Sequence, residues 1–139
     1  MTISATGKSQ KGVMLLEAMI GILIFSAGIL ALIGLQAKAI SSTIDANYRS
    51  QASFLVSDII GQIWVDRPNM ANYTYPSGSA PALIAWLARV NNELPGAAAN
   101  PPQITVNAAT GQVTVTVRWQ PPYTVTPHSQ TAIAQIANP

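Results

Sequence analysis

One carboxylate stands in a long uncharged segment near the N-terminus. Glu17 follows the apolar run Val13-Met14-Leu15-Leu16, and residues 18–37 then carry no charged side chain. At the centre of a membrane helix a carboxylate costs roughly 2.5–3.5 kcal/mol on insertion scales. Charged residues in such segments are rare without a partner, so Glu17 calls for a specific explanation.

The segment around Glu17 has the dimensions of a membrane span. Residues 18–37, as a helix rising about 1.5 Å per residue, would cross the roughly 30 Å of hydrocarbon in a bilayer. Lys8 and Lys11 precede the segment, and a glycine, Gly12, separates them from the apolar run. The positive-inside tendency keeps these lysines in the cytoplasm and places the larger C-terminal part outside.

Together, Lys8, Lys11, Gly12 and Glu17 resemble the class III signal sequence of type IV prepilins. The resemblance implies that residues 1–12 are a leader and that a prepilin peptidase cuts after Gly12. Val13 would then be the new N-terminus, which is methylated, and Glu17 the fifth mature residue. Phenylalanine is commonest in the family where this chain has Val13.

The same resemblance gives Glu17 a partner. In a fibre, its carboxylate would pair with the amine of Val13 on a neighbouring subunit. An ion pair inside a bundle of helices is strongly preferred to a single unpaired charge. The pair would also fix the axial register of an incoming subunit.

Two simpler interpretations remain for this segment. A secretory signal peptide is one, because Ala37-Lys38-Ala39 has the small-x-small form of its cleavage site. The apolar region is longer than the usual 7–15 residues and contains Glu17, which weighs against it. A plain single-pass anchor is the other, and it leaves Gly12 and Glu17 without a role.

The chain beyond the apolar segment continues as a helix and then changes character. No proline occurs before Pro68, so one helix is predicted over residues 13–66, with residues 13–37 in the membrane and residues 38–66 amphipathic. Its apolar or small residues recur at steps of three or four: Ile40, Ile44, Tyr48, Ala52, Leu55, Ile59 and Ile63. This spacing predicts one buried helix face.

Residues 67–139 are predicted to form a small α+β head. Prolines, asparagines and Gly78 indicate a loop over 67–82, and helical spacing predicts a short helix over 83–94. Alternating runs predict a hairpin of strands 103–107 and 113–119, and residues 131–137 are a candidate third strand. A long helix packed on such a head is the pilin-like plan.

Composition argues against a catalytic site. Of seven basic residues two lie in the predicted leader, which leaves five against five acidic residues. There is no cysteine and only one histidine, His128, so no thiol nucleophile and no metal-ligand spacing is present. No cofactor, metal or small-molecule substrate is therefore expected. The protein is predicted to be a non-enzyme that is itself a peptidase substrate.

Three head segments look like the PilV-type minor pilins: Arg67-Pro68-Asn69, the helix with Trp86 that leads to Leu94-Pro95-Gly96, and Val113–Trp119. The resemblance implies a minor pilin of the bacterial inner membrane, with a periplasmic head, that later joins a surface pilus fibre. Its partners would be other major and minor pilins, the inner-membrane assembly platform and the lipid bilayer. It would help initiate or modify pilus assembly and so support adhesion or twitching motility.

Two other functions share the leader and the long helix. One is a minor pseudopilin of a type II secretion system. The other is a DNA-uptake pseudopilin, for which Arg67, Arg89 and Arg118 against Glu93 provide a small basic excess in the head.

Overall fold

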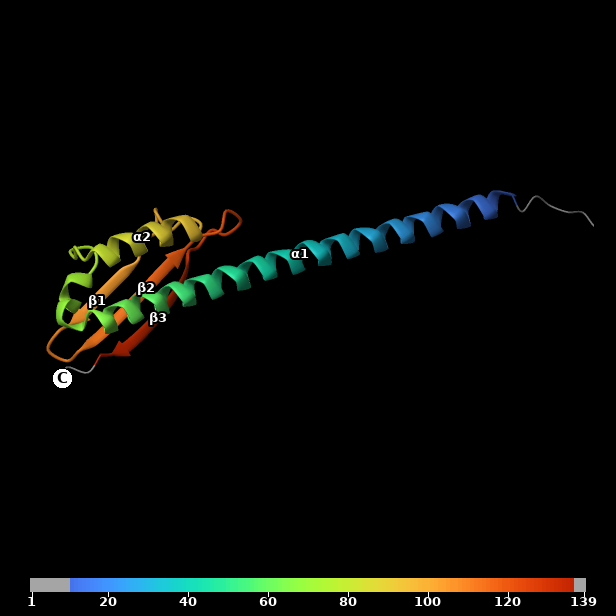
Figure 1. The fold of residues 1–139 in the computed structure, drawn as a ribbon. Helices are drawn as coiled ribbons and strands as arrows, with labels where there is room; N and C mark the ends of the chain where they lie inside the picture. The colour runs from blue at the N-terminus through green and yellow to red at the C-terminus, as the bar shows by residue number, and fades with distance from the viewer. Residues whose placement is uncertain (1–10, 137–139) are drawn as a thin grey trace, which may run out of the picture. The chain divides into compact units, whose positions relative to one another are not determined.

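The computed structural model describes residues 11–136 (Figure 1). Most of the predicted leader, residues 1–10, lies outside the described residues, as does Ala137 of the predicted third strand. In chain order the elements are α1 (Lys11–Val65), the 3₁₀-helix η1 (Arg67–Tyr73), α2 (Pro81–Glu93), β1 (Gln103–Asn107), β2 (Gln112–Trp119) and β3 (His128–Gln135). The chain is thus a long N-terminal helix followed by a small α+β head.

Helix α1 confirms the prediction of one uninterrupted helix over residues 13–66. It spans 55 residues and begins two residues earlier than predicted. Pro68, which lies at the start of η1, prevents a direct continuation because its ring cannot occupy a helix interior. The chain divides into two compact units between Thr43 and Ile44, so the second part of α1 belongs to the same unit as the head.

The sheet has three antiparallel strands in the order β1-β2-β3. The predicted hairpin is confirmed, with Ile104 opposite Val115. In its turn, the side-chain oxygen of Asn107 accepts hydrogen bonds from the amides of residues 109 and 110. Gly111 closes the turn at φ +71°, a left-handed conformation that glycine adopts without steric cost.

The third strand is confirmed but lies earlier than predicted. It covers His128–Gln135 instead of 131–137, because β2 is long enough to pair with it from Trp119↔His128 to Gln112↔Gln135. The first residues of β3 are polar, so they lack the alternation of apolar and polar residues that predicts a strand. Only their pairing with β2 places them in the sheet.

The predicted loop over 67–82 is wrong for its first part and for its last two residues, which begin α2 two residues before the predicted start of that helix at 83. Residues 67–73 form η1, whose start is favoured by a proline in its first turn. The side-chain amide of Asn69 donates to the Asp66 carboxylate at 2.8 Å and holds this short helix against the end of α1. Residues 74–80 are irregular, with one bridge from Tyr75 to Ile104.

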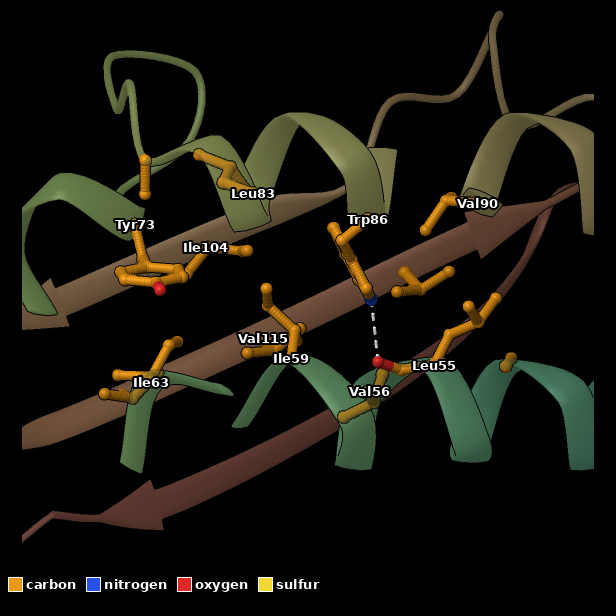
Figure 2. Packing of buried hydrophobic residues seen from close by; sticks show 14 of the residues in the cluster. Leu55, Val56, Ile59, Ile63, Tyr73, Leu83, Trp86, Val90, Ile104 and Val115 are labelled. Carbon is orange, nitrogen blue, oxygen red and sulfur yellow. Dashed lines mark hydrogen bonds between the residues drawn. The ribbon is translucent and has the colours of Figure 1, made fainter. Parts of the chain in front are cut away.

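The core lies between the sheet and the two helices α1 and α2 (Figure 2). Four residues of the predicted stripe are fully buried: Ala52, Leu55, Ile59 and Ile63. Tyr48 is partly buried, whereas Ile40 is 63% exposed, so the stripe is buried only where the head covers it. On β2, Val113, Val115, Val117 and Trp119 face the same core.

Trp86 of α2 is the central contact between the two helices. Its side chain is 1% exposed, and its indole N–H donates to the backbone carbonyl of Leu55 at 2.8 Å (Figure 2). A buried indole N–H without an acceptor would be costly, so this hydrogen bond fixes the register of α2 on α1.

Candidate functional site

The predicted cleavage position lies at the very start of α1. Gly12 and Val13 both fall in its first turn, where backbone N–H groups have no partner within the helix. The Val13 side chain is 68% exposed. The Gly12–Val13 peptide bond is therefore at the end of a helix with no packed neighbour among the described residues.

Glu17 lies one helical turn beyond Val13. Residues four apart on a helix share a face, so the amine that cleavage would create and this carboxylate lie on one side of α1. Glu17 is exposed, and no described side chain forms an ion pair or hydrogen bond with it. The structure thus places Val13 and Glu17 on one face of α1, and residues 11–136 leave this face uncovered.

The large side chains of the apolar segment around these residues are exposed in the part of the chain that the structure describes. Every large hydrophobic side chain between Val13 and Leu35 is between 43% and 75% exposed. This part of α1 is long and apolar enough to cross a membrane. The Ser26 hydroxyl donates to the Ile22 carbonyl at 2.7 Å, which satisfies this polar group inside its own helix.

A charged cluster joins the two helices of the head. Arg89 of α2 forms ion pairs with Asp58 of α1 at 2.8 Å and with Glu93 at 3.2 Å. Its guanidinium also lies 5.7 Å from the ring centre of Phe54. Both carboxylates raise the pKa of Arg89, with the hydrogen bond to Glu93 the largest cause. Arg89 was counted in the small basic excess of the head, but it is ion-paired with two carboxylates.

A second polar contact lies at the end of α1. Tyr73 is 2% exposed, and its hydroxyl donates to the Asp66 carboxylate at 3.1 Å. Burial raises the pKa of Tyr73 above its ordinary value of 10.0, and the hydrogen bond and charge of Asp66 raise it further. The neutral phenol is the form that suits the fold.

We expect this contact to make the protein sensitive to alkaline pH. Below pH 10.0, the ordinary pKa of tyrosine, the contribution of Tyr73 to stability is fully present, and it is lost as the pH rises through the raised pKa. In Tyr73→Phe, nothing at this position ionises. Urea unfolding of both proteins between about pH 8 and pH 11.5 should show their free energies of unfolding converging above pH 10. A constant difference across this range would contradict the assignment.

The other polar side chains that could take part in a site, His128 and Asp45, do not lie together in one cluster. His128 pairs across the sheet with Trp119, and their ring centres are 5.7 Å apart. The Asp45 carboxylate accepts a hydrogen bond from the Tyr123 hydroxyl at 2.9 Å. Within residues 11–136, no group of three His, Cys, Asp or Glu side chains is arranged to hold a metal ion.

Sequence reasoning missed the Arg89–Asp58 ion pair and the Tyr73–Asp66 hydrogen bond. Asp58 and Arg89 are 31 residues apart, and no periodic pattern connects them. Asp66 and Tyr73 are seven residues apart, across a segment predicted to be a loop. The sequence offered one indication of these contacts. Asp58 and Asp66 are isolated carboxylates in a region with few charged residues, and such carboxylates often have a specific partner.

No family model, curated protein or solved structure matches the chain.

Proposed function

We propose that the protein is a minor type IV pilin of the PilV type. It is a non-enzymatic subunit that prepilin peptidase cuts after Gly12. It then sits in the bacterial inner membrane with its head in the periplasm and helps to initiate or modify assembly of the surface pilus fibre. Through that role it supports adhesion or twitching motility.

One observation carries the proposal. Glu17, the sole charged side chain between residues 13 and 37, lies one turn after Val13 on a helix surface that nothing in the described chain covers. A plain anchor would gain from replacing this residue with an apolar one. A helix that packs beside copies or relatives of itself can use an ion pair to fix its axial register. The Glu17 carboxylate and the Val13 amine of a neighbouring subunit would form such a pair.

The shape of the head supports the same function. The second part of α1 supplies one wall of the head core, so this part of the helix and the head form one compact unit. A head that is built directly on the second part of a long helix suits a subunit of a fibre. Other major and minor pilins, the assembly platform and the lipid bilayer are the proposed partners.

The test is co-expression with a prepilin peptidase, followed by intact mass and N-terminal sequencing. We expect a mature chain that starts at methylated Val13 only when the peptidase is present. Gly12→Val should block the cut and serves as the control for site choice. An uncut chain, or a cut after Ala39, would overturn the pilin assignment. Deletion strains scored for surface pili and for secreted enzymes then separate the pilin from a secretion pseudopilin.

A further inference from the structure

Strand β3 forms one edge of the sheet. It pairs with β2 along one side, and no strand among residues 11–136 pairs with its other side. The opposite edge of the sheet is shorter and partly covered. There, β1 has five residues, and the backbone carbonyl of Ile104 accepts a hydrogen bond from the Tyr75 backbone N–H at 3.0 Å. The free side of β3 is therefore the longer unpaired edge.

The register shows which backbone groups lie at this edge. In an antiparallel pair, alternate residues of a strand direct their N–H and C=O groups toward the partner strand, and the residues between them direct these groups away. Directly after β3, the Ile136 N–H donates to the Gly111 carbonyl at 2.8 Å, so the even-numbered residues of β3 face β2. The residues that direct their backbone groups to the free edge are Ser129, Thr131, Ile133 and Gln135.

This edge lacks the features that commonly prevent strand pairing. Proteins protect sheet edges with charged side chains, prolines, bulges or very short strands. Strand β3 has eight residues, none of which is Pro, Asp, Glu, Lys or Arg, and its register with β2 continues without a bulge. The residues that point to the free edge are all exposed, and the Ile133 side chain is 66% exposed. The edge is thus open to a further strand.

We propose that the free edge of β3 binds an extended, uncharged segment of a partner protein, which adds a strand to the sheet. The edge presents N–H donors and C=O acceptors in regular alternation, and an extended peptide backbone presents the complementary groups at the same spacing. Strand β3 offers no Asp, Glu, Lys or Arg side chain to pair with a charged segment. An aromatic residue opposite Ile133 is favoured, because aromatic and β-branched side chains form stabilising cross-strand pairs.

A second copy of this chain could also offer β3 as the added strand. The head part of α1 covers the core face of the sheet (Figures 1 and 2), so two copies joined edge to edge would bring two such helices to one edge. A single extended segment brings no helix, and we therefore assign the edge to a partner segment. The inference rests on the head alone and does not depend on the pilin assignment.

The edge can be tested with a synthetic strand on the full chain in detergent micelles. The probe is a short peptide of alternating threonine and valine with one central tyrosine. It is N-methylated at alternate residues, so that only one of its edges can pair and it cannot assemble with itself. Hydrogen exchange of backbone amides, followed by NMR, is the measurement. Without the probe, the amides of Thr131 and Ile133 should exchange faster than those of Ala132 and Ala134, which face β2. At a probe concentration about ten times its Kd, exchange at Thr131 and Ile133 should slow about tenfold.

A matched probe and two variants locate the contact. The same peptide N-methylated at every residue has no N–H donor on either edge and should not bind. Thr131→Pro removes one outward N–H while leaving the hydrogen bonds to β2 in place, and it should weaken probe binding about tenfold. Val125→Pro adds a proline at an exposed loop position outside β3 and should bind the probe as the parent chain does. Circular dichroism checks that each variant is folded, and the fully methylated peptide tests the same contact without changing the protein.

Three outcomes would overturn the proposal: no saturable slowing of exchange at Thr131 and Ile133, equal binding of the fully methylated peptide, or unchanged binding by folded Thr131→Pro. Slow exchange of these amides without any probe would also overturn it, because the edge would then already be covered. If that protection rose with protein concentration, a second copy would be the occupant. A failure of peptidase processing would remove the pilin assignment but would leave these results as they stand.

Discussion

Trp86→Ala is expected to destabilise the head by about 3–5 kcal/mol, because it removes a large buried side chain and leaves a cavity between α1 and α2. The free energy of unfolding of a domain is commonly only about 5–15 kcal/mol, so this substitution would remove much of the stability of the head. Trp86 is 1% exposed, and it also supplies the hydrogen bond to the Leu55 carbonyl. Urea unfolding of the full chain in micelles, followed by circular dichroism, measures the change.

Two further variants interpret that result. Trp64→Ala makes the same chemical change at a side chain that is 44% exposed and should cost much less, since it removes few packed contacts. Trp86→Phe keeps most of the volume but loses the indole N–H, and we expect an intermediate cost of about 1–2 kcal/mol. Equal losses from Trp64→Ala and Trp86→Ala would show that Trp86 does not hold the helices together.

Glu17→Gln is expected to leave cleavage after Gly12 unchanged while reducing incorporation into the fibre by about two orders of magnitude. In the proposed bundle, the variant would bury the amine of a neighbouring Val13 without its counter-charge. Loss of one partner of a buried ion pair costs about 3–5 kcal/mol. Immunoblots that compare the mature protein in sheared pili with the protein in the membrane fraction measure the ratio.

Ser26→Ala is the matched control for this variant. It changes another polar side chain of the same segment, but its hydroxyl is already satisfied by the Ile22 carbonyl of the same helix. Incorporation of Ser26→Ala should equal that of the parent chain. Normal incorporation of Glu17→Gln would show that the carboxylate has no pairing role in a fibre, and its presence in the apolar segment would need another cause.

Local patterns were sufficient for most of the elements. The long apolar segment without proline predicted α1, and alternation about a Gly111 turn predicted the β1–β2 hairpin. These signals work because backbone hydrogen bonding in helices and hairpins is satisfied between residues near in sequence. Gly12, Val13 and Glu17 were likewise available from sequence, because their significance depends on spacing along one helix.

Tertiary structure decided the features that depend on distant residues. The sequence could not show that the helical stripe is buried at Ala52 but exposed at Ile40, because that boundary depends on where α2 and the sheet cover α1. Nor could it indicate that Arg89 meets Asp58, or that the Tyr73 hydroxyl donates to Asp66. Along the chain the sequence determined one helix, one misplaced carboxylate and a small sheet, since these follow from periodicity and charge. Only packing between segments that are far apart decided which side chains are paired, which are covered, and where the head remains open.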